Sequence, residues 1–292
     1  MIGSNFWWFG RLLVLLVLIP QIYGWGKEGH IATCKIAEGL LTEEAAAGVQ
    51  SLLPESAEGD FSSVCPWADT MRFHYYWSRA LHYADTPDFR CNYSYCRDCH
   101  DNKNRKDRCV TGAIFNYTNQ LMSRSDPQNT HNLTEALMFL GHFMGDAHQP
   151  LHCGFIGDEG GNSINLRWFK RKANLHHVWD TLMIETAMKT YYNRDLDTMI
   201  ESIQRNISNG GFDDISSWDK CNATVCPNQY ASESVNLACR YAYRNATPGV
   251  TLGDEYFDSR LPVMEKRLAQ GGIRLAAVLN RIFSTSLPLA AE

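Results

Sequence analysis

Three potential metal ligands fall within the eleven-residue stretch from His142 to His152, and their spacing limits how the chain can fold. His142 and Asp146 are four residues apart, so on a helix they lie on one face, about one turn apart, with side chains directed at one point. Pro150 is expected to end that helix and to leave His152 just beyond its last turn. The stretch therefore predicts a helix that carries a metal site, and zinc suits such ligands.

A second pair with the same spacing, His176 and Asp180, follows later in the chain. Chance gives fewer than one such pair in a chain of this composition, so two are suggestive. Surface ion pairs and hydrogen-bonded core histidines remain alternatives on spacing alone. If both helical faces meet, they can share a cluster of metal ions. Further candidate ligands precede them, namely Trp25, His30, Asp69 and His82.

Residues 1–24 have the pattern of a cleaved signal peptide, with Arg11 followed by an apolar run and then by Pro20 and Gly24. The run is much shorter than the roughly 20 residues that a membrane span needs. We therefore expect a secretory protein without a membrane span, destined for the extracellular space or the vacuole. Residues 25–292 are expected to form a single catalytic domain, and trimming of the tail after about residue 284 stays open.

The ten cysteines of a chain on this route are expected to form disulfides, and their even number permits five. Cys96, Cys99 and Cys109 offer a zinc knuckle as the less favoured alternative. Asn-x-Ser/Thr sequons agree with secretion, and their asparagines are expected at the surface. These asparagines are Asn92, Asn116, Asn132, Asn206, Asn222 and Asn245.

The periodicity of apolar residues predicts an all-α protein, mostly helical with few short strands. Thr134, followed by Glu135, is predicted to cap one helix, and Asn174 another. Residues 85–108 and 206–229 are polar and predicted to be disulfide-stapled loops. The predicted helical segments are residues 31–41, 133–147, 175–189 and 262–283.

The net charge bears on the class of partner. Removal of the leader, whose one charged side chain is Arg11, changes the formal charge from −5 to −6. Such a chain has no strongly basic surface for nucleic acids. Bound zinc ions would, however, place positive charge in the site itself. The charge therefore does not exclude phosphodiester chemistry.

Several short motifs occur after the leader in a fixed order. They are Trp25-Gly-Lys-Glu-Gly-His30, Trp67-Ala-Asp69-Thr-Met-Arg72, Leu81-His82-Tyr-Ala-Asp85, the stretch from His142 to His152, Gly160-Gly-Asn162 and Asn174-Leu-His176-His-Val-Trp-Asp180. Together they resemble the zinc-dependent nuclease family of fungal single-strand-specific nucleases and plant bifunctional nucleases. The resemblance spans essentially the whole chain after the leader. The cysteine-rich loop and the sequons are closer in type to the plant members.

The resemblance implies the fold shared by these nucleases and zinc phospholipases C, with three Zn²⁺ ions in a cleft. By similarity, the first zinc would take Asp69, His82, His142 and Asp146, and the second His152, His176 and Asp180. The third would take the α-amino nitrogen and carbonyl of Trp25, His30 and the other oxygen of Asp146. A free α-amino group has a pKa near 8 and can become a ligand, whereas an amide nitrogen cannot.

The resemblance also assigns roles around the ions. Asp69 would orient the nucleophile, and Arg72 would hold the phosphate oxygens in the transition state. Tyr83 would stack on a base and Asp85 would hydrogen-bond to it, which requires an unstacked nucleotide. Gly161 and Asn162 would line the pocket opposite them. The remaining histidines, His74, His100, His131, His148 and His177, are interpreted as surface, packing or structural residues.

The expected function is hydrolysis of single-stranded DNA and RNA to 5′-phosphorylated products by a monomer, with 3′-nucleotidase activity on 3′-nucleotides. A zinc-dependent phospholipase C is the enzymatic alternative, and it would lack the base pocket of Tyr83, Asp85 and Asn162. A non-enzymatic, glycosylated zinc-binding protein is the other alternative. The presence of Asp69 and Arg72 beside the ligands argues against it.

Overall fold

The computed structural model describes residues 25–284 of the 292-residue chain. The predicted leader and the tail after Ser284 lie outside the described residues, so leader cleavage and tail trimming stay predictions. Helices dominate and the strands are few and short, which confirms the predicted fold class. No helix within residues 25–284 is long and apolar enough to cross a membrane.

Short connections join the elements along the chain. The α-helices are α1 (Lys27–Glu38), α2 (Glu43–Leu52), α3 (Phe61–Val64), α4 (Trp67–Met71), α5 (Tyr95–Asp98), α6 (Val110–Met122), α7 (Leu133–Asp146), α8 (Leu175–His177), α9 (Met183–Tyr191), α10 (Leu196–Ser208), α11 (Ile215–Trp218), α12 (Pro227–Leu237) and α13 (Asp254–Phe283). The 3₁₀ segments are η1 (Glu55–Ala57), η2 (Tyr76–His82), η3 (Ser123–Ser125), η4 (Pro150–Cys153) and η5 (Ile156–Asp158). The π-helical segments are η6 (Val178–Leu182) and η7 (Ala238–Ala242), and the strands are β1 (Asn165–Trp168), β2 (Arg171–Asn174) and β3 (Thr251–Leu252).

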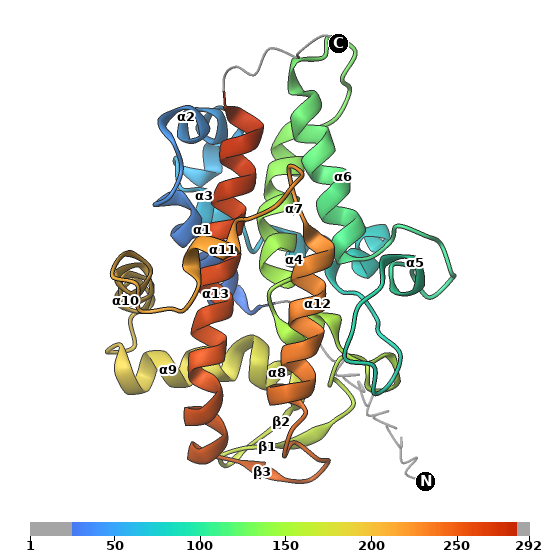
Figure 1. Ribbon diagram of the computed structural model, residues 1–292, viewed down its shortest axis with the longest axis vertical. Helices are drawn as coiled ribbons and strands as arrows, with labels where there is room; N and C mark the ends of the chain where they lie inside the picture. The colour runs from blue at the N-terminus through green and yellow to red at the C-terminus, as the bar shows by residue number, and fades with distance from the viewer. Residues whose placement is uncertain (1–24, 285–292) are drawn as a thin grey trace, which may run out of the picture.

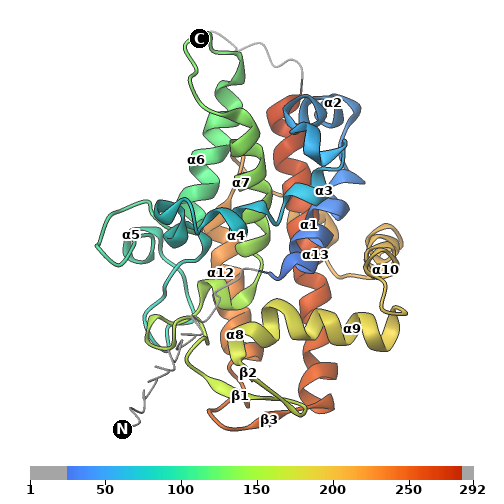
Figure 2. The same cartoon turned by 180° about the vertical axis from the view of Figure 1, so that it is seen from behind.

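The long helix α13 runs along the longest axis of the molecule, and α9 crosses it near the end that carries the strands (Figure 1). Seen from behind, α1 lies against α13, and α4 lies across α7 (Figure 2). The small sheet has the order β2-β1-β3, with β1 antiparallel to β2 and parallel to β3. The strands therefore close one end of a bundle of helices.

Two apolar cores share the long helix. One joins α6 and α7 to the C-terminal part of α13 and contains Phe139, Phe143 and Leu279. The other joins α9 and the sheet to the N-terminal part of α13 and contains Trp168 and Trp179. Burial of large apolar side chains is the main stabilising contribution in such a fold. The two cores therefore fix both halves of α13 in place.

Helix α7 confirms the predicted helix, and every residue from Ala136 to Asp146 is buried. Its N-cap is Asn132, whose side-chain oxygen accepts from the backbone N–H of Glu135 at 3.2 Å. The prediction of Thr134 as the cap is wrong, because the helix already begins at Leu133 and asparagine is a better N-cap than threonine. The helix ends at Asp146, and Pro150 begins η4, so His152 lies beyond the helix as predicted.

The predicted segment after Asn174 forms one continuous run of α8, η6 and α9 that ends at Tyr191. Asn174 caps it as predicted, because its side chain accepts from the backbone N–H of His177 at 2.7 Å. The π-helical segment η6 in this run carries Asp180. Such segments insert one extra residue into a helix and redirect the side chains around it. Here the segment places Asp180 on the buried side.

Helix α13 was predicted to begin at Pro262, but it begins at Asp254. Proline inside a helix removes the hydrogen bond to the carbonyl four residues earlier, here that of Asp258. Both Asp258 and Pro262 are exposed, so water can satisfy that carbonyl. The first predicted helix lies earlier in the chain than expected, because α1 begins at Lys27 and ends at Glu38.

Four disulfides are formed, where the cysteine count permits five. Three of them involve cysteines of the predicted loops, although each loop also contains a short helix, α5 or α11. Cys96 is an exposed free thiol and Cys153 a buried one. The zinc-knuckle alternative is wrong, because Cys99 and Cys109 are bonded to each other. The pairs are Cys34–Cys65, Cys91–Cys239, Cys99–Cys109 and Cys221–Cys226.

All six sequon asparagines are exposed, which confirms their predicted position at the surface. Their glycosylation stays a prediction. Surface exposure is required because the attached sugar is bulky and solvated.

Candidate active site

Buried histidine and aspartate side chains converge in three groups near the C-terminal end of α7. In each group the nitrogen and oxygen atoms lie within 4.8 Å of one another. Every member is 6% exposed or less, so water cannot solvate these polar atoms freely. The first group is Asp69, His82 and His142; the second is His30, His142 and Asp146; the third is His152, His176 and Asp180.

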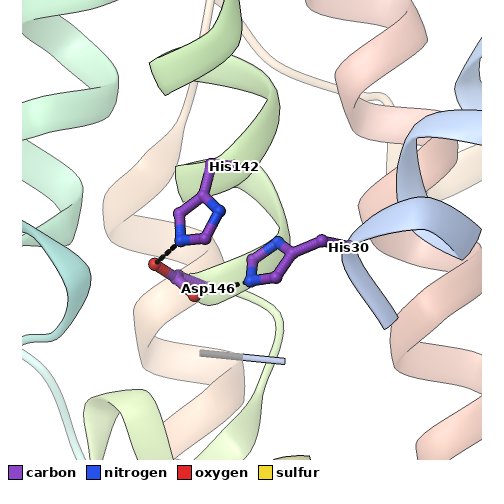
Figure 3. A group of neighbouring side chains, drawn as sticks. All are labelled: His30, His142 and Asp146. Carbon is purple, nitrogen blue, oxygen red and sulfur yellow. Dashed lines mark ion pairs between the residues drawn. The ribbon is translucent and has the colours of Figure 1, made fainter. Parts of the chain in front are cut away.

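Asp146 joins the first two groups, because its two carboxylate oxygens face different histidines. Oδ2 lies 3.2 Å from His142 Nε2 and 3.1 Å from His82 Nδ1. Oδ1 lies 3.4 Å from His30 Nε2. Figure 3 shows His142 and Asp146 projecting from α7 toward each other, with His30 reaching Asp146 from α1. The carboxylate is therefore placed to bridge two ions.

The spacing of these atoms matches tetrahedral zinc. With metal–ligand distances of about 2.0–2.1 Å, two tetrahedral ligand atoms lie about 3.3 Å apart. His176 Nε2 lies 3.2 Å from Asp180 Oδ2 and 3.2 Å from His152 Nε2. Asp69 Oδ1 is more distant, at 3.8 Å from His142 Nε2. The donors thus surround positions of the size that a zinc ion needs.

Several potential metal-ligand atoms of the first two groups are buried and have no hydrogen-bond partner among the described residues. They include both ring nitrogens of His30, Nε2 of His82, Oδ1 of Asp69 and both carboxylate oxygens of Asp146. An unsatisfied buried polar atom costs about 1–3 kcal/mol, and a metal ion bound between these atoms would remove that cost. Imidazole and carboxylate donors without thiolate fit zinc.

The electrostatics agree with metal binding. Burial lowers the pKa of His30 and of His82, so both rings are neutral and keep a lone pair. Burial opposes ionisation of Asp146, but the neighbouring His142 and His152 outweigh it and hold the Asp146 pKa well below its usual range. Neutral rings at His30 and His82 beside an ionised Asp146 are the protonation states that metal ligands need. At His142, burial lowers the pKa, but the charges of Asp146 and Asp69 outweigh it and raise the pKa, so a bound metal ion would have to displace a proton there.

Backbone carbonyls orient three of the histidines. His142 Nδ1 donates to the carbonyl of Cys65 at 2.8 Å, and His152 Nδ1 to that of His82 at 2.6 Å. His176 Nδ1 donates to the carbonyl of Gly160 at 2.7 Å. Because a carbonyl can only accept, each contact places the proton of a neutral ring on Nδ1 and directs Nε2, with its lone pair, into the site.

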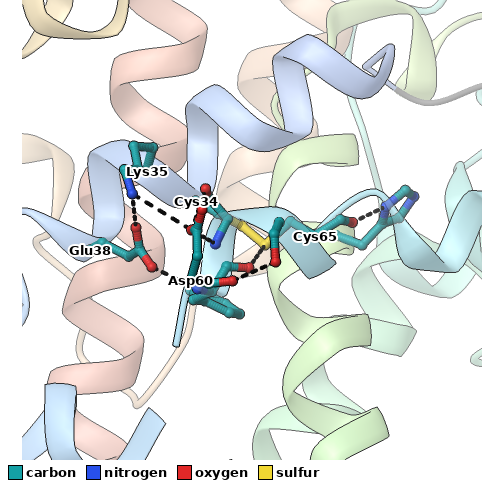
Figure 4. Close-up of a disulfide and its surroundings, with 9 residues drawn as sticks. Cys34, Lys35, Glu38, Asp60 and Cys65 are labelled. Carbon is teal, nitrogen blue, oxygen red and sulfur yellow. Dashed lines mark hydrogen bonds and ion pairs between the residues drawn. A yellow bond between two sulfur atoms is a disulfide. The ribbon is translucent and has the colours of Figure 1, made fainter. Parts of the chain in front are cut away.

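A disulfide fixes the first of these carbonyls. Cys65 is bonded to Cys34 on α1, the helix that also carries His30 (Figure 4). Phe61, in α3 just before Cys65, donates its backbone N–H to Glu38 Oε1 at 2.7 Å. The segment that leads to Asp69 is therefore tied to α1 at two points.

Sequence reasoning missed Gln149, which is buried beside the third group. Its amide Nε2 donates to Asp180 Oδ1 at 2.5 Å, and its Oε1 accepts from the backbone N–H of Leu151. Gln149 thereby connects Asp180 to the segment that carries His152. Its place inside the His142–His152 stretch was the available signal.

Trp25 lies beside His30 of the second group. Its side chain is fully buried, and the neighbouring Gly26 N–H donates to the carbonyl of Asp180 at 2.8 Å. A Cβ placed on Gly145 would meet His30 Nδ1 at 2.7 Å and the indole of Trp25 at 3.6 Å. Glycine at 145 therefore lets His30 and Trp25 approach α7 closely.

A cavity of about 410 Å³ opens beside the third group and is lined by His152 and His176. Tyr83, Asp85 and Asn162, the predicted base-binding residues, all line it. Gly161 was also expected to line the cavity, but it is buried behind the lining. Gly160 lines the cavity instead. Burial raises the pKa of Asp85 to about 6, assisted by Glu159 and Asp158 and opposed by His100. The structure thus joins a base-sized cavity to the cluster of donors.

His100 was interpreted as a surface or packing residue, but it lines this cavity together with Asp101 and Asn102. The Cys99–Cys109 disulfide closes the loop, and the carboxylate of Asp101 accepts from the backbone N–H groups of Lys103 and Arg105. The position of His100 depends on this loop, so spacing along the chain could not reveal it.

Asp69 and Arg72 lie together at the edge of the first group, with Nη1 of Arg72 at 3.7 Å from Asp69 Oδ1. Both are almost fully buried, at 6% and 7% exposure. Both come from the turn of α4, where a spacing of three residues places them on one face. A guanidinium so placed offers several donors to an anion.

His148 is structural, as predicted. Its Nδ1 donates to the carbonyl of Met144 at 2.7 Å, and Arg274 donates to its Nε2 at 3.0 Å. Burial, with the charges of Arg267 and Arg274, holds its pKa well below the usual range. His74 and His131 are exposed and His177 is half-buried, in agreement with their interpretation.

Comparison with known proteins agrees with this site. The S1/P1 nuclease family matches residues 25–284. Endonuclease 4 of Arabidopsis thaliana is 64% identical over 95% of both chains. Nuclease S1 of Aspergillus oryzae is 32% identical over 92% of this chain and 95% of its own, and nuclease P1 of Penicillium citrinum is 31% identical over 90% and 99%. The matches cover both the elements that carry the donor groups and those that line the cavity, and the chain therefore belongs to the S1/P1 nuclease family.

Proposed function

We propose that this protein is a zinc-dependent endonuclease that hydrolyses single-stranded DNA and RNA to 5′-phosphorylated products and removes the phosphate from 3′-nucleotides. The observation that carries the proposal is the shared wall of the site, because His152 and His176 belong to a donor group and also line the cavity of Tyr83 and Asp85. A base in the cavity would bring its own 3′ oxygen next to the cluster. The phospholipase and the non-enzymatic alternatives draw no support from the comparisons.

The donor groups would hold three zinc ions. The first ion would lie at the first group (Asp69, His82 and His142), and the second ion at the third group (His152, His176 and Asp180). The third ion would lie at the second group. Asp146 would bridge the first and third ions, and His30 would bind the third. When bound, zinc ions lower the pKa of water toward about 7 and neutralise charge on a phosphodiester. The ligand geometry above supports this assignment.

Trp25 would complete the third ion site with its α-amino nitrogen and carbonyl once the leader is removed. Its burial beside His30 and Gly145 supports this assignment. Removal of the leader would then be needed to complete the site, because only a free amino group has a lone pair to donate.

The side chains around the ions would orient the reacting groups. The Asp69 carboxylate would accept a hydrogen bond from the attacking water and orient it toward the phosphorus atom. Arg72 would donate to the non-bridging phosphate oxygens, whose charge grows in the transition state. Tyr83 would stack on the base and Asp85 would hydrogen-bond to its edge. Because duplex bases are already stacked and paired, this cavity favours single strands.

The proposal is tested with the purified protein, a single-stranded oligonucleotide, its duplex form and a 3′-nucleotide. We expect cleavage of the single strand and the 3′-nucleotide, loss of both activities with a chelator, and recovery with Zn²⁺. Labelling of the products at their 5′ ends only after phosphatase treatment would confirm the 5′-phosphates. Failure of the zinc-loaded protein to cleave either nucleic acid would refute the proposal.

The expected environment follows from the same features. Four disulfides and six exposed sequons support a place along the secretory route, with the extracellular space or the vacuole as the destination. We also propose that the protein acts as a monomer.

A further inference from the structure

Exposed aromatic side chains gather beside the site, in the segment that connects Arg72 to His82. Phe73 is 44% exposed, Tyr76 67% and Trp77 46%. They account for three of the eight large apolar side chains that are exposed within residues 25–284. Such a concentration on a protein surface marks an interaction site. We call these three residues, with Arg79, the aromatic ledge.

Two arginines, Arg72 and Arg79, flank the aromatic rings of the ledge. The guanidinium of Arg79 lies 4.4 Å from the centroid of the Tyr76 ring, and that of Arg72 lies 5.4 Å from the Phe73 ring. Arg79 Nε donates to the carbonyl of Arg72 at 3.0 Å, which fixes the ledge to the phosphate-facing arginine. Among the described residues, Arg79 makes no ion pair with a carboxylate within 4.0 Å, so its charge is available to an anion.

The ledge borders the site at both of its ends. Its first residue follows Arg72, which pairs with Asp69 in the first donor group. Near its other end, the carbonyl of Trp77 accepts from Arg108 Nη2 at 2.7 Å. Arg108 Nε in turn lies 3.7 Å from Asp101, which lines the base cavity. A strand that runs from the cavity past the first donor group, or past Asp101 and Arg108, would therefore meet the ledge.

Exposed aromatic rings beside arginines are the chemistry of single-strand binding. Bases of any identity stack on exposed rings, and guanidinium groups pair with phosphates. In a chain with a formal charge of −5, this cluster of arginines is a local exception that suits a polyanion. We propose that the aromatic ledge is a second binding site, for the nucleotides that flank the one held in the Tyr83–Asp85 cavity. The inference rests on the proposed nuclease function.

The test compares a long and a short substrate. An oligothymidylate of about ten nucleotides reaches beyond the cavity, whereas a 3′-mononucleotide does not. We expect Tyr76→Ala to raise KM for the oligonucleotide about fivefold more than KM for 3′-thymidylate, with kcat for both substrates within twofold of the unchanged enzyme. Tyr76→Trp retains a stacking face and is expected to restore the oligonucleotide KM.

Arg79→Gln tests the charge of the ledge. For a single strand, each phosphate contact contributes about 0.7 to the slope of log affinity against log salt concentration. We expect this variant to lower the slope for oligothymidylate by about that amount. Matched controls are Tyr191→Ala on α9, 54% exposed, and Arg205→Gln on α10, 62% exposed at its side chain. Both controls are expected to leave the two substrates and the salt slope unchanged.

The outcomes separate the two proposals. If the unchanged enzyme does not cleave the oligonucleotide, the proposed function fails. If it does, and Tyr76→Ala affects both substrates equally or neither, the ledge is not a nucleotide site and the inference is overturned. Loss of binding to vesicles of anionic phospholipid, with the oligonucleotide KM unchanged, would also overturn it and would make the ledge a membrane contact.

Discussion

Cys65 holds His142 through its backbone while its side chain is bonded to another helix. The carbonyl of Cys65 accepts from Nδ1 of His142 at 2.8 Å, and its sulfur is joined to Cys34 on α1. Gly141 leaves room for this arrangement, since a Cβ there would lie 3.0 Å from Cys65 Sγ and 2.8 Å from Phe61. The disulfide therefore serves the ligand shell as well as the stability of the fold.

The double variant Cys34→Ser/Cys65→Ser should weaken zinc binding. The carbonyl remains but loses its anchor, and loss of an outer-shell contact costs about 10–100-fold in metal affinity. Competition with a chromophoric chelator measures that affinity. The closed loop spans 31 residues, so the free energy of unfolding should also fall, by about 3–4 kcal/mol.

The matched control is Cys221→Ser/Cys226→Ser, which opens a disulfide with a sequence separation of 5, away from the donor groups. This control should lose less stability, since a short loop restricts the unfolded chain less. Its zinc affinity should stay that of the unchanged protein. Equal zinc affinity in both double variants would contradict the link between Cys65 and His142.

Asp146→Asn should disturb two ions, whereas His152→Ala should disturb one. Asp146 Oδ1 faces His30 and Oδ2 faces His82 and His142, so the neutral amide loses a bridging charge between two groups. His152 belongs to the third group, which retains His176 and Asp180. We expect a greater loss of bound zinc and of kcat in Asp146→Asn. Zinc counting by atomic spectroscopy after gel filtration, with steady-state kinetics, compares the two, and the reverse order would refute the bridging role.

The two histidine–aspartate pairs could be predicted from helical spacing, because each pair needs only one turn of a helix. The grouping of the other candidate ligands around the ions was expected only from the family resemblance. His142 with Asp146 and His176 with Asp180 fall into place once the helical periodicity is recognised, and both pairs meet as expected. The prediction of an all-α fold succeeded for the same reason, since apolar residues at helical spacing dominate the chain.

The features that were missed depend on contacts between distant segments. His100 reaches the cavity because a disulfide and the Asp101 carboxylate shape its loop, and no local pattern records that path. Gln149 belongs to no distinctive sequence pattern. Its role is visible only in the fold, where its amide contacts Asp180 on another helix. The start of α13 before Pro262 depends on solvent access to one carbonyl, which is a tertiary property.

Base preference should change with the protonation of Asp85. Its pKa of about 6, raised by burial, means that the carboxyl is neutral below that pH and ionised above it. An ionised carboxylate accepts two hydrogen bonds, which suits the N–H donors on the pairing edge of guanine but not adenine. The ratio of kcat/KM for 3′-guanylate to that for 3′-adenylate should rise about tenfold as the pH rises through 6.

Using a ratio cancels the titration of groups that both substrates share, such as the ligands and attacking water. Asp85→Asn should make the ratio independent of pH, because an amide does not titrate in this range. His100→Asn should move the midpoint upward, since His100 opposes the rise in the Asp85 pKa. A ratio that is flat in the unchanged protein would contradict the contact between Asp85 and the base.

Glu233→Gln should lower the free energy of unfolding, because Glu233 neutralises two buried arginines that pack against the segment after α7. Arg267 Nη1 lies 2.9 Å and Arg274 Nη1 2.6 Å from its carboxylate, and Arg267 Nε donates to the carbonyl of His148, just after α7. Burial would raise the Glu233 pKa, but Arg274 and Arg267 outweigh it and lower the pKa to about 2. Because this pKa lies below the usual 4.5, the stabilisation is complete above pH 4.5 and is lost as the pH falls toward 2. We expect a loss of about 3 kcal/mol in the free energy of unfolding at pH 7 that shrinks below pH 4.5, measured by urea denaturation.

Glu185→Gln, which breaks an exposed pair with Arg171, is the control and should change stability by less than about 1 kcal/mol at either pH. An equal effect of the two substitutions at pH 7 would show that Glu233 does not support the segment behind Asp146.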